Sequence, residues 1–207
     1  MECGKALTSL LSEAQIATPV EPSDELVGRA ASMLEGFGFL RSIAGDEDHD
    51  AVAKAYASLV ANQKGIKRGI LFAGPVGVGK THAATLFATH MRHPPVFLGP
   101  DTEVNVGAIM PDMLRNTDYG KAYVIDDLGR SADRMDYGNR SNPWLTFLYR
   151  WSGLHPTEAP ILYVTTNLDS RNLAEYCGSA IMSRLVERLV ICRLNGKDKR
   201  LTQTTLF

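Results

Sequence analysis

The sequence has few cysteines and no long apolar run, and each of these features excludes some classes of protein. Its three cysteines, Cys3, Cys177 and Cys192, lie far apart and form no CxxC pair. Neither a disulfide framework nor a zinc ribbon is therefore expected, and a reducing, cytoplasmic setting is the default. No segment approaches the roughly 20 consecutive apolar residues of a membrane span, and the N-terminus has no convincing signal-peptide pattern.

Composition and charge are those of an ordinary globular protein. The 207 residues carry a net charge of −1, with 44% hydrophobic and 22% charged side chains. These values argue against a mostly disordered, collagen-like or coiled-coil chain. The length suits one α/β domain with an appendage better than two full domains.

The small net charge conceals an uneven distribution. Residues 1–50 contain ten acidic and three basic side chains, so their net charge is −7 and that of residues 51–207 is +6. An acidic N-terminal segment is a poor nucleic-acid binder but a plausible protein-docking element, whereas a mildly basic body can meet phosphate groups. The excess of basic residues is no strong DNA-binding signature, and ordinary solvated faces are the alternative interpretation.

Helices are predicted in the N-terminal part of the chain. Apolar residues recur at helical spacing over residues 4–16 and 24–36, and again in the segment AVAKAYASLVAN that follows Asp50. Asp24 and Asp46 are candidate helix caps. The acidic run at 46–50 is interpreted as a solvated first turn favoured by the helix dipole rather than as a metal site.

A sheet is predicted in the rest of the chain. Short apolar runs alternate with helical segments and loops at 69–74, 95–99, 122–127, 161–167 and 189–192. Runs of this kind, buried on both faces, are typical of a parallel sheet covered by helices. We therefore predict an α/β fold and place a domain boundary near residue 60, with the helical N-terminal part as an appendage.

The most specific motif is the segment GPVGVGKT at residues 74–81, which fits GxxxxGKS/T. It follows an apolar run and opens a helical segment, which is the context of a phosphate-binding loop. Glycines let backbone N–H groups turn inward around a triphosphate, and the helix N-terminus adds positive potential. Lys80 would reach the β- and γ-phosphates, and the Thr81 hydroxyl would bind Mg²⁺. A turn that merely joins a strand to a helix would need neither side chain.

The motif also defines the candidate nucleotide-binding residues. They are Gly74, Pro75, Val76, Gly77, Val78, Gly79, Lys80, Thr81 and the adjacent His82. Because His82, His90 and His93 have no carboxylate at metal-ligand spacing, a metal-binding role is not assigned to them.

Two further strand ends carry polar groups suited to the same chemistry. The run AYVIDD ends in Asp126 and Asp127, and ILYVTTN ends in Asn167. Asp126 is the candidate Mg²⁺ ligand, and Asp127 the candidate general base or water-orienting group. Asn167 is placed to bind the γ-phosphate or to orient the attacking water. Without the phosphate-binding loop these residues would be ordinary strand ends, and Thr165 is interpreted as a plain strand residue.

A candidate single-stranded DNA surface has a structural alternative. The aromatic side chains are Trp144, Phe147, Tyr149 and Trp151, and the arginines on the preceding loop are Arg130, Arg134 and Arg140. Aromatic rings and basic groups together can stack and hold single-stranded DNA. Most of the rings lie at helical spacing with Leu148, however, so core packing is the favoured interpretation, and the arginines are the better DNA candidates.

Taken together, GPVGVGKT, VIDDLG, YVTTNLD and SRLVERL resemble an AAA+ ATPase of the DnaC/IstB helicase-loader family over roughly residues 65–200. The resemblance implies an AAA+ ATP-binding domain at 61–207 with a five-stranded parallel sheet, and leaves residues 1–60 as a helical, partner-docking segment. It further implies ATP and Mg²⁺ as ligands, with nucleotide bound at the interfaces of a homo-oligomer.

The resemblance carries roles to individual residues. It places Lys80, Thr81, Asp126, Asp127 and Asn167 on the nucleotide loop, the acidic strand and the first sensor. Arg188 matches the arginine finger that reaches the neighbouring subunit, with Arg184 as the alternative and a surface salt-bridge cluster as the structural alternative to both. Arg200 resembles the second sensor arginine. Since seven residues follow it, we expect no large C-terminal helical lid.

The expected activity follows from the same resemblance. It is an ATPase of DNA replication that loads or remodels a replicative helicase on single-stranded DNA. The alternatives are an IstB-like transposition regulator on duplex DNA, and a non-hydrolysing nucleotide-binding adaptor. The acidic pair is Asp-Asp rather than the commoner Asp-Glu, so slow intrinsic hydrolysis is expected.

Overall fold

The computed structural model describes residues 20–36, 46–62, 68–91, 95–99, 122–130, 134–136, 139–155 and 159–198. The helix predicted over residues 4–16 lies outside this part of the chain. Among the described residues, no helix combines the length and the apolar character needed to cross a membrane.

Five parallel strands form the central sheet, as the apolar runs predicted. In chain order they are β1 (Gly69–Ala73), β2 (Pro95–Leu98), β3 (Ala122–Leu128), β6 (Ile161–Thr166) and β7 (Leu189–Arg193). Their order across the sheet is β2-β3-β6-β1-β7, and each neighbouring pair is parallel. At its carboxyl end β1 has Ala73 opposite both Thr166 and Arg193, so the three strands end at one edge of the sheet.

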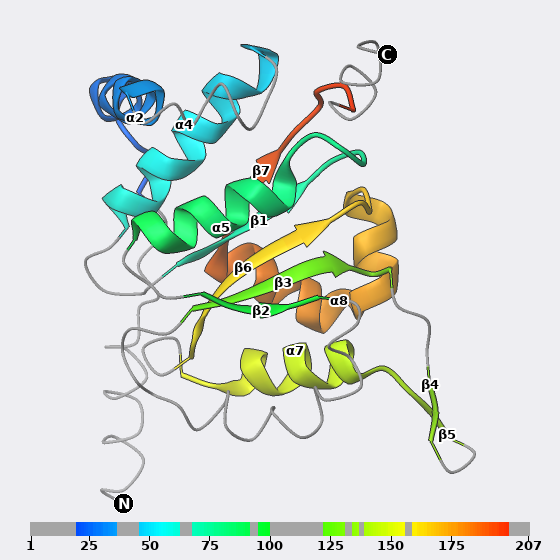
Figure 1. The fold of residues 1–207 in the computed structure, drawn as a ribbon. Helices are drawn as coiled ribbons and strands as arrows, with labels where there is room; N and C mark the ends of the chain where they lie inside the picture. The colour runs from blue at the N-terminus through cyan, green and yellow to red at the C-terminus, as the bar shows by residue number, and fades with distance from the viewer. Residues whose placement is uncertain are drawn as a thin grey trace, which may run out of the picture.

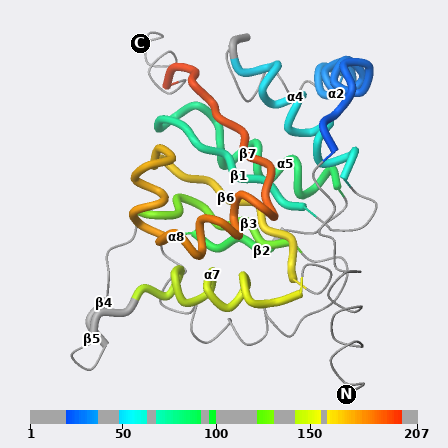
Figure 2. The backbone as a smooth tube through the Cα atoms, turned by 180° about the vertical axis from the view of Figure 1, so that it is seen from behind, coloured from blue at the N-terminus to red at the C-terminus, as the bar shows by residue number. Residues whose placement is uncertain are grey.

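Helices cover both faces of the sheet and give the fold three layers (Figure 1). The helices are α2 (Asp24–Gly36), α4 (Asp46–Ala61), α5 (Lys80–His90), α7 (Pro143–Gly153) and α8 (Ser170–Arg188). In both views α4 and α5 lie on one face, with α2 beside α4, and α7 and α8 lie on the other (Figure 2). Because alternate side chains of a strand point to opposite faces, Ile70 and Phe72 join the core beneath α4 and α5, whereas Leu71 joins the core beneath α7 and α8.

Helix α4, which lies before the domain boundary expected near residue 60, packs in the same hydrophobic core as the sheet and α5. Its buried side chains, including Val52 and Tyr56, share one hydrophobic cluster with Phe72 of β1 and Phe87 of α5. The Tyr56 and Phe87 rings stack with their centroids 5.4 Å apart. Packing is therefore continuous across residue 60. The sequence pattern could not show this, because an amphipathic helix does not reveal which surface covers it.

Helix α7 confirms the core interpretation of most of the aromatic run. Asn142 caps its N-terminus by accepting the backbone N–H groups of Trp144 and Leu145. Trp144, Phe147, Leu148 and Trp151 are buried, whereas Tyr149 is exposed. The segment before α7, expected to be a loop, contains a two-stranded antiparallel hairpin, β4 (Arg134–Asp136) and β5 (Asn139–Ser141), that is separate from the main sheet.

Candidate active site

The phosphate-binding loop connects β1 to α5 and takes a backbone form that glycine permits. Gly77 has φ of 81° and Gly79, the N-cap of α5, has φ of 94°. Side chains other than glycine rarely adopt these values, because the Cβ atom clashes with the backbone there. Backbone geometry thus explains why the motif has glycine at these positions. The loop places the N-terminus of α5 at the carboxyl edge of the sheet.

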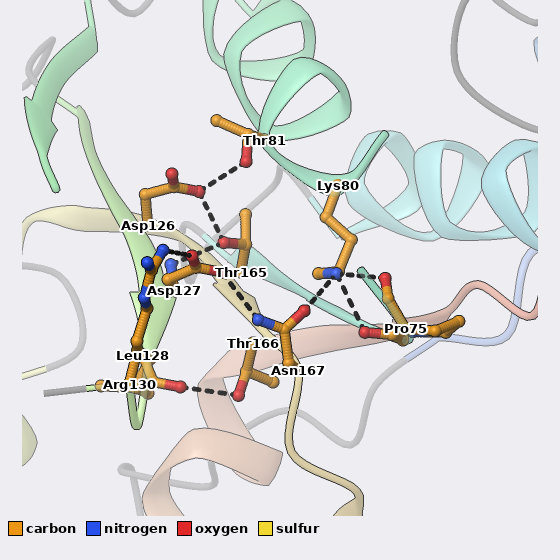
Figure 3. A network of polar contacts seen from close by, with 11 residues as sticks. Pro75, Lys80, Thr81, Asp126, Asp127, Leu128, Arg130, Thr165, Thr166 and Asn167 are labelled. Atoms are coloured by element: carbon orange, nitrogen blue, oxygen red, sulfur yellow. Dashed lines mark hydrogen bonds and ion pairs between the residues drawn. The ribbon is translucent and has the colours of Figure 1, made fainter. Parts of the chain in front are cut away.

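Lys80 lies at the centre of the site and is 5% exposed. Its Nζ donates to the carbonyl oxygens of Gly74 at 2.9 Å and Pro75 at 2.6 Å, and to Oδ1 of Asn167 at 2.7 Å (Figure 3). The ammonium group is therefore held at the tips of β1 and β6. A buried ammonium with three oxygen acceptors is a prepositioned cation, suited to a phosphate that takes over some of these bonds.

Asp127 and Asn167 form the next link of this network. The Asn167 side-chain amide donates from Nδ2 to Oδ1 of Asp127 at 2.9 Å, while its oxygen accepts from Lys80. Arg130 donates to the other carboxylate oxygen of Asp127 at 3.1 Å. Asp127 has φ of 56°, the only positive φ outside glycine among the described residues. Such conformations concentrate at functional sites, where surrounding contacts hold them.

Asp126 and Thr81 face each other across the loop. The Thr81 hydroxyl donates to Oδ1 of Asp126 at 2.7 Å, and Thr165 donates to the same oxygen at 2.7 Å. A hydroxyl and a carboxylate are hard oxygen ligands, and Mg²⁺ in phosphate sites takes one or two such protein ligands beside phosphate and water. The pair therefore fits the Mg²⁺ site predicted from the sequence.

Thr165, interpreted from the sequence as a plain strand residue, belongs to the hydrogen-bond network of the candidate site. Besides its bond to Asp126, its hydroxyl oxygen accepts the backbone N–H of Asp127 at 2.9 Å. It thus fixes both members of the acidic pair from the adjacent strand β6. The signal that could have revealed it is a hydroxyl two residues before Asn167 on a strand that is buried throughout.

The network lines a polar cleft of about 740 Å³. Lys80, Thr81, Asp126, Asp127 and Asn167 all face it, so the structure brings together the residues that three separate motifs predicted. A second groove, of about 920 Å³, lies along β7 between the N-terminal helices and α8 and contains none of these five residues.

The remaining loop residues have different environments. Val76 and His82 are exposed and line the cleft. Pro75 contributes its carbonyl oxygen to Lys80, and Val78 is buried in the core, so only the backbone of Val78 can face a ligand. Arg200 lies outside the described residues.

Arg188, which the sequence analysis preferred as an intersubunit arginine, points into the protein interior. It is 5% exposed, and its guanidinium donates to the carbonyl oxygens of Trp151 at 3.1 Å, Ser152 at 3.1 Å and Leu154 at 2.8 Å. It also lies 5.2 Å from the centroid of the Trp151 ring. Burial lowers the pKa of Arg188 from its ordinary value, an effect that the nearby Glu187 opposes. These contacts join the end of α8 to the end of α7, a structural role.

Arg184, the alternative, is one turn earlier on α8 and remains accessible. Its side chain is 47% exposed, and Nη1 forms an ion pair of 2.6 Å with Glu187. An exposed pair of this kind contributes little to stability and exchanges readily with solvent or another partner. Of the two arginines, Arg184 is the one whose charge can reach a second molecule.

Arg130, a candidate for DNA contact in the sequence analysis, donates a hydrogen bond to Asp127 of the acidic pair. Its side chain is 69% exposed, so the contact closes one side of the cleft without burying the guanidinium. Arg134 and Arg140 lie on β4 and β5, which form a sheet of their own, away from the main sheet (Figure 1).

Comparison with known proteins supports the class of the fold and no finer assignment. No family model matches the sequence, and no curated protein is significantly similar to it. A variant of RuvB from Thermotoga maritima matches 74% of this chain and 45% of its own, with 18% identity and a TM-score of 0.50. The match shows that the chain has the α/β fold of AAA+ P-loop NTPases.

Two further structures are similar at a lower TM-score. The T. maritima RuvB Holliday junction branch migration motor matches 84% of this chain and 45% of its own, with 17% identity and a TM-score of 0.44. AMPPCP-bound DnaA from Aquifex aeolicus matches 73% of this chain and 48% of its own, with 15% identity and a TM-score of 0.43. The matched region thus spans less than half the length of each of the three.

Proposed function

We propose that this chain binds Mg²⁺-ATP in the polar cleft and hydrolyses it. The observation that carries the proposal is the convergence of Lys80, Asn167 and Asp127 into one hydrogen-bonded chain, next to the Thr81–Asp126 pair. A phosphate-binding lysine, two oxygen ligands for a cation and a carboxylate at one strand edge are the parts that phosphoryl transfer to water requires. The AAA+ fold is consistent with ATP hydrolysis at the carboxyl edge of the sheet.

Each side chain has a defined part in the proposed reaction. Lys80 shifts its donors from the carbonyl oxygens of the loop to the phosphates and offsets their charge. Bound Mg²⁺, held by Thr81 and Asp126, would supply further neutralisation of phosphate charge. Asp127 orients the attacking water and accepts its proton, while Asn167 holds that carboxylate in place through Nδ2 and can present its oxygen to Lys80 or the water.

The proposed oligomer uses Arg184 rather than Arg188 across the subunit interface. Arg184 is exposed and has a single, solvent-accessible ion pair with Glu187, so turning outward costs it little. Arg188 would have to abandon three carbonyl oxygens in the interior. A guanidinium donated from a neighbour would stabilise charge on the γ-phosphate and make hydrolysis depend on assembly.

For the biological role, we propose a DNA-replication ATPase that loads or remodels a replicative helicase on single-stranded DNA. The resemblance of its motifs to the DnaC/IstB family supports this role, and the acidic N-terminal region offers a docking element that repels DNA. One structural neighbour is described as a Holliday junction branch migration motor. ATP would then act as a switch, since the γ-phosphate would connect Lys80 in one subunit to Arg184 in the next.

The test is native mass spectrometry of the protein with a replicative helicase, with and without Mg²⁺-ATP. The role predicts a complex of defined stoichiometry that forms with ATP and is lost in Lys80→Ala. No complex under any nucleotide condition contradicts loading. Long filaments on duplex DNA would then favour the IstB-like alternative. Absence of turnover with DNA and partner present, with none gained by Asp127→Glu, would favour the non-hydrolysing adaptor.

A further inference from the structure

Asp48 is a buried carboxylate that the chemistry described so far does not use. It lies in the first turn of α4 and is 1% exposed, although the acidic run around it was expected to be solvated. Its Oδ1 accepts the backbone N–H of Asn195 and its Oδ2 that of Gly196, both at 2.8 Å. Burying a carboxylate is costly unless its oxygens are paired, and here two peptide N–H groups from a distant part of the chain pair them.

The segment that Asp48 holds, residues 194–198, follows β7 and has neither helical nor strand structure. The Leu194 N–H donates to the carbonyl oxygen of Ala73 at 2.8 Å, which keeps the segment beside the end of β1. Leu194 and Gly196 are buried, whereas Asn195 and Lys197 are exposed. The segment thus alternates between core and solvent, and Asp48 fixes its middle.

The same segment lies directly against the phosphate-binding loop. A Cβ atom on Gly74 would collide with the carbonyl oxygen of Leu194, and one on Gly77 would collide with the carboxylate of Asp198. Two glycines of the loop are therefore packed against the 194–198 segment at its two ends. The segment forms a wall that limits which backbone conformations the loop can take.

We propose that Asp48 is a positioning residue for nucleotide binding, which holds residues 194–198 against Gly74 and Gly77 and thereby preorganises the phosphate-binding loop. The inference rests on the proposed function, since it concerns affinity for ATP. If the free loop is in its binding-competent conformation only part of the time, its apparent affinity for the ligand is reduced to that fraction of the intrinsic affinity. Because Asp48 of α4 holds residues 194–198 in place, the loop is ordered before the ligand binds, and this reduction in affinity is avoided.

The contact also makes the N-terminal helices and the nucleotide site a coupled pair. The carboxylate of Asp48 joins α4 to the segment after β7 through its hydrogen bonds to Asn195 and Gly196. Whatever shifts α4, including a protein docked on α2 and α4, would pull on Asn195 and Gly196 and change nucleotide affinity. By thermodynamic reciprocity, bound nucleotide would change affinity for that docked protein by the same factor.

The test compares Asp48→Asn with Asp50→Asn, which removes an exposed carboxylate from the same helix. The dissociation constant for a fluorescent ATP analogue with Mg²⁺ is measured together with the thermal midpoint and amide hydrogen exchange. We expect Asp48→Asn to weaken binding about tenfold, with faster exchange at Asn195 and Gly196 and in the phosphate-binding loop. Asp50→Asn should leave all three unchanged. Asp48→Ser, a smaller side chain that can accept one amide, replaces Asp48→Asn if the latter does not fold.

The outcomes separate this inference from the proposed function. A lower thermal midpoint with an unchanged dissociation constant would mean that Asp48 serves stability alone and would overturn the inference. Unchanged exchange in the phosphate-binding loop would overturn it as well. If the wild-type protein itself binds no ATP analogue, the proposed function fails first, and the inference that rests on it fails with it.

Discussion

Replacing Arg188 by alanine should destabilise the protein strongly, whereas replacing Arg184 should not. Arg188→Ala removes three hydrogen bonds from a charged donor to the carbonyl oxygens of Trp151, Ser152 and Leu154. At about 1.5 kcal/mol for each bond of a charged donor, and about 1 kcal/mol for the lost contact with the Trp151 ring, the free energy of unfolding should fall by about 5.5 kcal/mol. Arg184→Ala loses one exposed ion pair and should change it by less than about 0.5 kcal/mol.

Urea denaturation followed by tryptophan fluorescence measures both changes, and ATP turnover measured at a temperature where both variants are folded gives the functional counterpart. We expect the Arg184 variant to be stable but slow in turnover, and the Arg188 variant to be unstable. Arg188→Lys keeps the charge but cannot reach all three carbonyl oxygens, so its stability should be intermediate. A stable Arg188→Ala protein with normal assembly and no turnover would refute the structural role and restore Arg188 as the intersubunit arginine.

Three further predictions concern the acidic pair, the loop and the thiols. Asp127→Glu should raise turnover, because its carboxylate reaches about one bond further toward the attacking water; a rate at or below that of the parent would contradict the explanation for slow hydrolysis. Gly77→Ala should weaken ATP binding and cost about 1–3 kcal/mol of stability, since its φ of 81° is strained for alanine and the side chain of Asp198 occupies the Cβ position. Burial raises the pKa of Cys177 to about 11 and, with a smaller contribution from the charge of Asp48, that of Cys192 to about 12, from an ordinary 9.0. The unfolded chain therefore releases these protons first, so the free energy of unfolding should be highest below pH 9.0 and fall as pH rises toward about 12, a decline that urea titrations of the wild type and a Cys192→Ser variant would show or exclude.

The sheet and the phosphate-binding loop could be predicted because their signals are local. Each of the five strands is a short apolar run, and the loop is a contiguous motif whose glycines, lysine and threonine have fixed spacing. Parallel strands end at the same edge, so Asp126, Asp127 and Asn167 could be placed near Lys80 without knowing the strand order. Their mutual hydrogen bonds, in contrast, depend on β6 lying between β1 and β3.

The residues that were misjudged depend on contacts between distant parts of the chain. Asp48 belongs to an acidic run typical of a solvated helix start, and its partners Asn195 and Gly196 are almost 150 residues away. Arg188 lies in a charged motif typical of a surface, yet the ends of α7 and α8 meet and bury it. No periodicity or spacing in the sequence indicates these contacts, because they depend on how the helices and the segment after β7 pack together in the folded chain.

Paired measurements of ATP binding and ATP turnover test whether one cleft binds Mg²⁺-ATP through Lys80 and hydrolyses it through Asp127. The wild type, Lys80→Ala, Asp127→Asn and a control, Lys54→Ala, which removes an exposed lysine of α4, would be compared by calorimetry and phosphate release. We expect Lys80→Ala to bind ATP at least about tenfold more weakly, Asp127→Asn to bind ATP without hydrolysing it, and Lys54→Ala to resemble the wild type. Equal binding by Lys80→Ala, or undiminished turnover by Asp127→Asn, would contradict this expectation.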